Sequence, residues 1–413
     1  MSKKLRIGVF GAYRGKTMIK FCAYYPEAEL VAICDKYEPA LEECKKITKE
    51  HCADVTMYTD FEDFIKHDMD AVVLANYAHE HAPYAIRCLN LGLHVFSEVL
   101  PAQTLKQAVE LVEAVEKSGK VYAYGENYCY FPATAEMRKL YRAGRIGEFR
   151  YGEADYLHNC APIWPSITYG DKNHWRNWKY ASYYCTHSIG PVVHITGLRP
   201  KSVVGFELDP AKRMTELGYL GGEAAIEMIT FENNTFLRSI HGNMFKDNIF
   251  YSIYGERGNI ESERNGEGVG KVIFCDNGEF SFYKPELEVN ETTKQIFEHG
   301  GSDYYTMHYF IKKILHGDPD KDSIDVYEAM DMFLPGIFAY KSMLNGNIPM
   351  EIPDFRKKED RDKYRNDTFC CDKALAGDML APSHSRGNPE IPDETYEKVK
   401  NMWLNEQKSA YKD

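Results

Sequence analysis

Near its start the chain carries the stretch Leu5-Arg-Ile-Gly-Val-Phe-Gly-Ala-Tyr-Arg-Gly15, an apolar strand that runs into a glycine-containing turn. In dinucleotide-binding folds, glycines at this point let backbone amides approach a pyrophosphate at a helix N-terminus. The spacing is not a strict G-x-G-x-x-G, because the glycines are Gly8, Gly11 and Gly15. Taken alone, the pattern is equally consistent with a turn that needs glycine only for its geometry.

The second apolar run strengthens the dinucleotide interpretation. It ends at Asp35, about 24 residues after Gly11, where a carboxylate can accept hydrogen bonds from the adenosine ribose hydroxyls. An isolated strand-end acid is more often a solvated surface group, so the prediction rests on the combination with the glycines. It favours NAD over NADP, although the neighbouring Lys36 keeps NADP open. The predicted cofactor contacts in this part are Gly8, Gly11, Tyr13, Arg14 and Asp35.

Strands and helices alternate through the first 127 residues. Apolar strand runs are predicted at Arg6–Phe10, Leu30–Cys34, Ala71–Asn76, His94–Ser97 and Val121–Tyr124. The clearest helix lies between the last two of these, with Thr104 as its N-cap and Gly119 at its end. Such alternation predicts an α/β fold whose first domain, residues 1–127, is a doubly wound parallel sheet of the Rossmann type.

The pattern changes after residue 127. A helix near Pro132–Arg142 is followed by long alternating segments. Strands are predicted at Glu148–Leu157, Ser202–Leu208, Ala225–Phe231, Phe236–His241 and Ile249–Tyr254. They indicate a second, α+β domain over residues 128–353, with an open, mainly antiparallel sheet that is covered on one face.

The last part of the chain has a different character again. Two helices are expected near Tyr304–Leu315 and Val326–Met343, packed across either domain. Residues 354–413 form a polar tail with charge runs and prolines. We expect this tail to wrap a neighbouring surface or a neighbouring subunit rather than form a third domain.

The composition excludes several classes of partner. A net charge of -12 without a basic block argues against nucleic acid and against an anionic membrane surface. Eleven scattered cysteines, an odd number, do not suggest a disulfide framework. No apolar run approaches a bilayer span, and the early strand leaves no room for a signal peptide. A cytoplasmic location is therefore expected.

Two further segments, Ala75-Asn-Tyr-Ala-His-Glu-His-Ala-Pro83 and Gly92-Leu-His-Val-Phe-Ser-Glu98, resemble the Gfo/Idh/MocA oxidoreductase family. The resemblance implies an N-terminal Rossmann domain and a C-terminal open-sheet domain that carries a sugar site. It also implies a homo-oligomer, a dimer or a tetramer, because these open sheets often pair face to face. Of the two loop histidines only the second, before Ala-Pro, matches the motif. The implied nucleotide or nicotinamide contacts are Asn76, Tyr77, His81 and Glu98.

The chain departs from the simple sugar dehydrogenases of that family at two positions. Those enzymes follow the glutamate with lysine and proline, whereas this chain reads Glu98-Val-Leu-Pro101. They also carry an aspartate four residues before the active-site histidine, and here that position is Tyr183. Two of the three usual catalytic groups are absent, so the plain dehydrogenase mechanism does not transfer directly.

A narrower resemblance accounts for these departures. Glu126-Asn127, Tyr156-Leu-His158-Asn159, His174-Trp-Arg176 and Tyr184-Cys-Thr-His187-Ser-Ile-Gly-Pro191 are similar to the NAD-dependent glycosidase branch, glycoside hydrolase family 109. The resemblance implies hydride transfer from the sugar C3 carbon to bound NAD. Removal of the acidified C2 proton, loss of the C1 substituent, addition of water and return of the hydride would follow.

The implied catalytic set is Tyr184, His187, His158, Glu126 and Tyr156, with Asn127, Trp175 and Arg176 as further cofactor contacts. A histidine titrates near neutrality, so His187 suits deprotonation of the C3 hydroxyl. Tyr184 would share a helical face with it and act as a base if a neighbouring cation lowers the pKa of the phenol. Glu126 and His158 would serve the leaving oxygen or the water, and Tyr156 would line the pocket.

Other interpretations stay open at this level. The aromatic residues between 164 and 184 suit either a core or a wall for stacking sugars. His158, Cys160, Cys185 and His187 are conceivable zinc ligands, but their spacing matches no closed site, and no metal is expected. The alternatives for the whole chain are a simple sugar or polyol dehydrogenase, and a non-catalytic nucleotide-sensing or assembly protein.

Overall fold

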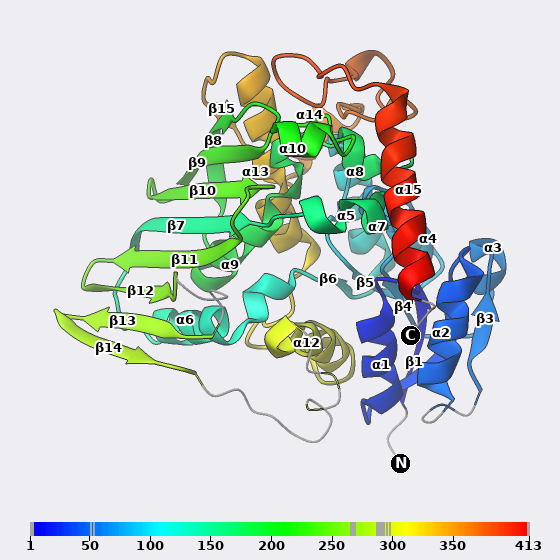
Figure 1. Ribbon diagram of the computed structural model, residues 1–413. Helices are drawn as coiled ribbons and strands as arrows, with labels where there is room; N and C mark the ends of the chain where they lie inside the picture. Colours follow the sequence, from blue (N-terminus) through cyan, green and yellow to red (C-terminus); the bar gives the residue numbers. More distant parts are fainter. Residues whose placement is uncertain are drawn as a thin grey trace.

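The computed structural model describes residues 4–49, 52, 54–264, 270–285, 294, 296 and 299–410. Two β-sheets of different construction lie side by side, and helices fill the space between and around them (Figure 1). The first sheet has six strands and the second has nine.

The six-stranded sheet is parallel throughout, which confirms the predicted Rossmann-type fold. Its order is β3-β2-β1-β4-β5-β6. The strands are β1 (Leu5–Phe10), β2 (Ala28–Cys34), β3 (Thr56–Tyr58), β4 (Ala71–Leu74), β5 (His94–Ser97) and β6 (Tyr122–Tyr124). The strand order reverses between β1 and β4, and in such sheets ligands bind at that switch point, beyond the carboxyl ends of the strands.

Helices connect these strands and cover the sheet. They are α1 (Lys16–Tyr24), α2 (Glu38–Thr48), α3 (Phe61–Phe64), α4 (His81–Asn90) and α5 (Leu105–Ser118). The predicted signals of α5 are confirmed, because the Thr104 hydroxyl accepts a hydrogen bond from the Gln107 amide at 3.1 Å. Gly119 ends the helix with φ 63°, a conformation that costs glycine little. The strand β3 was not predicted, because three residues are too few to show a period.

The second sheet has the order β14-β13-β12-β11-β7-β10-β9-β8-β15. Its strands are β7 (Phe149–Leu157), β8 (Pro200–Glu207), β9 (Ala224–Phe231), β10 (Phe236–Gly242), β11 (Asn248–Gly255), β12 (Gly258–Ser262), β13 (Val272–Asp276), β14 (Glu279–Tyr283) and β15 (Met350–Glu351). Neighbours are antiparallel except β7 and β10, which run parallel. The predicted open, mainly antiparallel sheet is therefore confirmed.

One face of this sheet is covered and the other is open. The longer helices beyond the first sheet are α6 (Pro132–Arg142), α9 (Thr186–Thr196), α12 (Ser302–His316) and α13 (Val326–Leu344). Helices α9 and α13 pack on the covered face, and α13 also reaches α5 and β6 of the first sheet. Helix α12 packs on α1. Helix α13 thus joins both sheets, whereas α12 packs on the Rossmann side.

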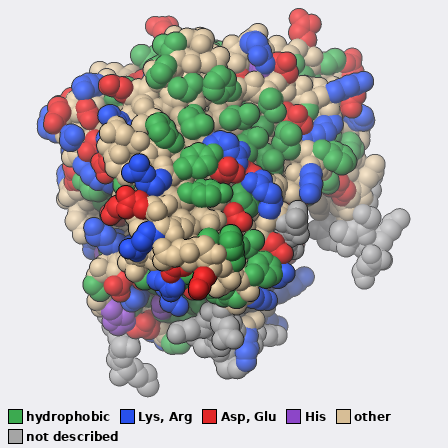
Figure 2. Space-filling model, turned by 90° about the vertical axis from the view of Figure 1, so that its left-hand side faces the viewer, with side chains coloured by type: hydrophobic (Ala, Val, Ile, Leu, Met, Phe, Trp, Pro, Cys, Tyr) green, Lys and Arg blue, Asp and Glu red, His purple; other side chains and the backbone are tan. Residues whose placement is uncertain are grey.

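The open face carries apolar and charged side chains together. Seen from the side of the nine-stranded sheet, hydrophobic side chains gather on the surface among Lys, Arg, Asp and Glu (Figure 2). Arg238 lies 2.6 Å from Asp155 on neighbouring strands. The large hydrophobic residues exposed on the strands are Phe206, Met228, Phe236, Tyr254, Phe280 and Phe282.

The polar tail wraps around its own chain. It contains α14 (Lys358–Tyr364), which packs on α5, and α15 (Asp393–Ala410), which packs on a short helix, α7 (Trp164–Thr168). In Figure 1 α15 runs from the second sheet's side of the molecule down towards α2. The tail therefore bridges the two sheets. No described helix combines the length and apolar character needed to cross a membrane.

The anchoring of α14 predicts a measurable contribution to stability. The buried Arg361 guanidinium donates to Glu116 of α5 at 2.8 Å and to the Phe355 carbonyl at 2.7 Å. Arg361→Met leaves these acceptors without their donor, and we expect the free energy of unfolding in urea to fall by about 2 kcal/mol. The control is Lys363→Met on the same helix, whose exposed ion pair with Asp360 is screened by water and should change the free energy of unfolding much less. Equal effects of the two changes would contradict this account.

Candidate active site

Two adjoining cavities lie between the sheets. The larger has a volume of about 1080 Å³ and the smaller about 320 Å³. The residues that line both are Arg14, Glu98, Val99, Ile167, Arg176 and Tyr184. A ligand in the larger cavity would therefore meet a ligand in the smaller one at these side chains.

The larger cavity lies at the switch point of the Rossmann sheet. Gly11 follows β1 with φ 100°, and a Cβ there would lie 2.4 Å from the carbonyl carbon and oxygen of Ala75, after β4. Only glycine permits this approach of the two loops. Beside this loop, the Asp35 carboxylate accepts hydrogen bonds from the amides of Ala12 at 2.7 Å and Tyr37 at 2.9 Å. The geometry is that of a dinucleotide cradle.

Most of the predicted cofactor residues line this cavity. They are Gly11, Tyr13, Arg14, Asp35, Asn76, Tyr77, His81, Glu98, Trp175 and Arg176. Gly8 is not among the described residues that line either cavity. A Cβ on Gly8 would lie 2.6 Å from the Met69 sulfur, so a glycine is needed there for packing under the sheet. Asn127 lines the smaller cavity instead, and its amide donates to Asp303 at 2.9 Å.

Ion pairs and hydrogen bonds fix the position of charged and neutral side chains where the two cavities meet. The Arg14 guanidinium lies 2.8 Å from Glu98 and 3.5 Å from Asp303. Although burial opposes it, these carboxylates raise the pKa of Arg14, which stays charged. His81 is buried with Nδ1 3.0 Å from the Leu100 carbonyl oxygen, and burial lowers its pKa to about 4. A neutral His81 thus ties the loop after β4 to the loop after β5.

Buried polar atoms show that the larger cavity suits a polar ligand. The indole nitrogen of Trp175 and the side-chain oxygen of Asn76 have no hydrogen-bond partner among the described residues. Buried polar groups are normally satisfied, so such atoms beside a cavity fit a ligand with its own donors and acceptors. Together with the Gly11 approach and Asp35, they fit a nicotinamide dinucleotide.

Four of the five predicted catalytic residues line the smaller cavity. Tyr156 lies on β7 and His158 just after it, while Tyr184 ends a 3-10 turn, η4 (Ala181–Tyr184), and His187 lies in the first turn of α9. Glu126 lies behind His187, fully buried, with Oε1 2.6 Å from His187 Nδ1. A buried carboxylate at this distance orients the ring and stabilises the imidazolium.

Aromatic rings enclose His187. The Tyr128 ring stacks on it with centroids 4.2 Å apart, and Tyr156 and Tyr184 meet it edge-on at 4.7 Å and 5.1 Å. The expectation that Tyr184 and His187 share one helix is wrong, because α9 begins at Thr186. Burial raises the pKa of Tyr184, and the nearby Arg176 opposes this only in part. The protein's own groups therefore do not supply the lowered pKa that a tyrosinate base needs.

The conceivable metal ligands do not converge. Cys160 Sγ lies 3.3 Å from His158 Nδ1, a contact that raises the pKa of His158. Despite burial, His158, Lys179 and Arg176 lower the pKa of the Cys160 thiol. Cys185 is buried elsewhere, with its sulfur 3.4 Å from the Met332 carbonyl oxygen. In the described part of the chain, no group of three or more His, Cys, Asp or Glu residues could hold a metal ion.

Sequence analysis missed two basic residues of the smaller cavity. Lys179 is half-buried there, and burial together with the Arg176 charge lowers its pKa to about 7. His241, at the end of β10, has Nδ1 3.7 Å from the fully buried Glu227, and burial lowers its pKa to about 3. The available signal for Lys179 was its position inside an aromatic run after the His-Trp-Arg motif. His241 gave no signal, because it looks like any inward residue of a strand.

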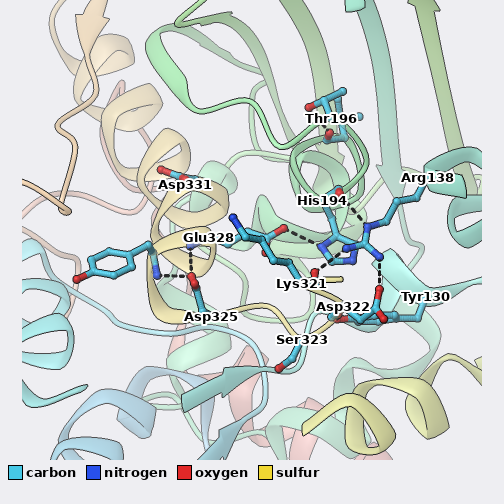
Figure 3. A network of polar contacts seen from close by, with 12 residues as sticks. Tyr130, Arg138, His194, Thr196, Lys321, Asp322, Ser323, Asp325, Glu328 and Asp331 are labelled. Atoms are coloured by element: carbon cyan, nitrogen blue, oxygen red, sulfur yellow. Dashed lines mark hydrogen bonds and ion pairs between the residues drawn. The ribbon is translucent and has the colours of Figure 1, made fainter. Parts of the chain in front are cut away.

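A polar network fixes the far end of α9 (Figure 3). Arg138 of α6 donates to Asp322 at 2.6 Å and to the His194 carbonyl at 3.2 Å. His194 is buried, with Nδ1 2.7 Å from Glu328 of α13. Because α6, α9 and α13 are tied together, His187 at the other end of α9 has a fixed position.

The comparisons with known families agree with this architecture. Residues 5–126 match the family described as "Oxidoreductase family, NAD-binding Rossmann fold". Residues 281–361 match "Glycosyl hydrolase 109, C-terminal domain". The chain thus combines a Gfo/Idh/MocA NAD-binding domain with a glycosyl hydrolase 109 C-terminal domain, and both predicted resemblances are confirmed.

Individual relatives extend over most of the chain. Glycosyl hydrolase family 109 protein 1 of Bacteroides thetaiotaomicron is 24% identical, covering 86% of this chain and 85% of its own. The family 109 protein of Solibacter usitatus is 25% identical, covering 86% and 88%. The solved structure of myo-inositol 2-dehydrogenase from Lactobacillus plantarum shares the fold, with a TM-score of 0.67 and 17% identity over 85% of this chain and all of that one.

Because Gly11 lies so close to the backbone of Ala75, adding a single methyl group at position 11 is predicted to weaken cofactor binding. Gly11→Ala forces the loop after β1 away from Ala75, and we expect the dissociation constant for NAD to rise at least about tenfold, measured by calorimetry. Gly119→Ala is the matched control, since that glycine also has positive φ but meets nothing within 4 Å. Unchanged NAD affinity in Gly11→Ala would show that the dinucleotide does not bind at this loop.

Proposed function

We propose that this protein is an NAD-dependent enzyme that acts on a sugar or glycoside, oxidising it at C3 and continuing to glycoside cleavage. The observation that carries the proposal is the junction of the two cavities at Tyr184, beside the His187–Glu126 pair. A cofactor and a sugar would meet where acid–base groups converge. The names of the glycosyl hydrolase 109 relatives support the same class.

The residues around the larger cavity would hold NAD. Asp35 is placed to accept hydrogen bonds from the ribose hydroxyls, which favours NAD over NADP. When bound, the cofactor accepts a hydride from the sugar C3 carbon and later returns it. Arg14, fixed by Glu98 and Asp303, would lie between the cofactor and the sugar and orient both.

We assign to His187 the removal of the proton from the C3 hydroxyl. Its Nε2 is the free ring nitrogen, since Nδ1 faces Glu126. The buried carboxylate would keep the ring in one orientation and stabilise the imidazolium that forms when the proton is taken. Tyr128 and Tyr156 hold the ring plane from two sides.

We assign to Tyr184 the removal of the proton from the C2 carbon. Burial keeps the phenol protonated in the protein alone, so a cationic cofactor in the adjoining cavity is needed to lower its pKa. Cofactor binding would thus switch on the base. His158, whose pKa is raised by Cys160, would protonate the leaving oxygen and then activate water.

The two halves divide these tasks. We assign cofactor binding to residues 1–127, substrate binding and oligomerisation to residues 128–353, and bracing of the two to the tail, 354–413. The open sheet face with its exposed Phe206, Met228 and Phe236 supports a homo-oligomer. All eleven cysteines are unpaired, which supports a cytoplasmic location.

A panel of glycosides in heavy water tests the function. The cleaving enzyme returns product that carries deuterium at C2, with no net reduction of NAD. A simple dehydrogenase accumulates reduced cofactor and leaves protium at C2. A protein that neither reduces NAD nor exchanges the C2 proton with any member of the panel is a sensor or an assembly factor.

The same panel tests the two proton assignments. In Tyr184→Phe we expect the C2 exchange rate to fall at least about 100-fold, since the general base is lost. Oxidation at C3 should be less affected, because His187 remains. Mass spectrometry of the product and the nicotinamide absorbance measure the two steps. If both steps stay intact in Tyr184→Phe, Tyr184 is not the base.

If Glu126 supports His187 as proposed, removing the Glu126 charge should slow the oxidation step. Glu126→Gln preserves the shape but removes the charge that stabilises the imidazolium, so kcat should fall about 100-fold with little change in NAD affinity. Glu136→Gln on α6 is the control, because Glu136 accepts a hydrogen bond from Tyr283 at 2.9 Å and is not among the described residues that line either cavity; it should keep full activity. A wild-type kcat in Glu126→Gln would leave His187 without a catalytic partner.

A further inference from the structure

The smaller cavity is rich in positive charge. Its lining includes the side chains of Arg14, Arg176 and Lys179. Glu98 is the only carboxylate among the described residues that line it, and it lies 2.8 Å from Arg14. The remaining two cations are therefore not balanced from within the cavity.

Lys179 has no carboxylate partner in the described part of the chain. Its Nζ lies over the Tyr184 ring, 4.6 Å from the centroid, and 5.8 Å from that of Trp175. The charges that face it are Arg176, which repels it, and the thiol of Cys160, which attracts it. Such cation–π contacts attract an ammonium but leave its charge uncompensated.

A half-buried ammonium beside a second cation is unfavourable unless something compensates it. The low pKa of Lys179, about 7, expresses this cost. Phosphates of a dinucleotide are not the natural partner, because Lys179 lines the smaller cavity and not the larger one. Arg176 lines both and could serve the cofactor. Cys160 is the one group in the described lining whose charge attracts Lys179, and an anion that enters the smaller cavity with the substrate would compensate the ammonium further.

We propose that this cavity recognises an acidic sugar, and that Lys179 forms an ion pair with the sugar's carboxylate, sulfate or phosphate group. This inference rests on the proposed function of the site, whose substrate class it specifies. The three groups share the chemistry that an ammonium recognises, an oxyanion with acceptor oxygens. His158 and Asn243, on the same lining, would supply further donors.

Binding of the anion should depend on pH. The groups that face Lys179 are Arg176, Cys160, His158, Tyr184 and His241. Below about pH 7 the ammonium is charged and binding is strong. As the pH rises through 7 the free protein loses this charge, and affinity for the acidic sugar falls. Affinity for a neutral sugar lacks this Lys179-dependent decline.

The test uses the full-length protein saturated with NAD. Methyl glucuronide and methyl galacturonide, methyl glucoside and galactoside 6-phosphates, and the 6-sulfates are compared with the neutral methyl glycosides. Calorimetry measures affinity, and turnover is measured by methanol release and by deuterium incorporation at C2 in heavy water, with the nicotinamide absorbance reporting any net oxidation. We expect one acidic class to bind at least about tenfold tighter than its neutral counterpart, as a charge-assisted hydrogen bond provides. Which class wins identifies the oxyanion.

Three variants make the result specific to Lys179. Lys179→Met should abolish the preference for the acidic sugar and its decline above pH 7. Lys179→Arg keeps the charge, so it should retain the preference and move the decline to higher pH. Lys212→Met is the control, since Lys212 is 88% exposed, begins α10 (Lys212–Thr215) and is not among the described residues that line either cavity. It should behave as the wild type.

The outcomes separate this inference from the proposed function. If neutral glycosides are oxidised and acidic ones bind no better, the proposed function stands and the anion site is overturned. If acidic sugars bind through Lys179 but are neither cleaved nor exchanged at C2, and no NAD is reduced, the anion site stands and the proposed function fails. A preference that survives in Lys179→Met places the recognition elsewhere and overturns the inference.

Discussion

The contact between His187 Nδ1 and Glu126 Oε1, 2.6 Å long and buried, is the interaction on which the site depends. Glu126 follows the last Rossmann strand, and His187 opens α9 under the second sheet. The contact therefore holds two separately built halves in register at the point where their cavities meet. A shift of either half would separate the carboxylate from the ring, and a buried charge without its partner is costly.

Other parts of the molecule serve the same alignment. The Arg138–Asp322 and His194–Glu328 contacts fix α9 from its far end, while α13 reaches from the second sheet to β6. The tail adds an outer brace, since α14 binds α5 and Trp403 of α15 lines the larger cavity. The tail is thus a structural part of the nucleotide site, although its composition suggests an appendage.

Sequence patterns predicted the elements that a local period specifies. Five of the six strands of the Rossmann sheet and the caps of α5 follow from residues close in the chain. The parallel pairing of β7 with β10 does not, because strand direction is decided by distant connections. The same distinction between local and distant information applies to the residues of the site. Motifs identified Tyr184 and His187, whereas the cavity position of Lys179 depends on where a turn near residue 180 meets β10.

The two departures from the family pattern have a common physical consequence. Val99 stands where simple dehydrogenases carry a lysine, and it lines the junction of the cavities as an apolar surface. Tyr183 stands where they carry an aspartate, and it is buried with its hydroxyl 3.4 Å from the Ala102 carbonyl oxygen. One cation and one anion are thereby absent from the junction. Lys179 adds a cation to the smaller cavity, and no carboxylate of the described residues forms an ion pair with it. The smaller cavity therefore has an excess of positive charge on the substrate side. An acidic sugar bound there would neutralise it.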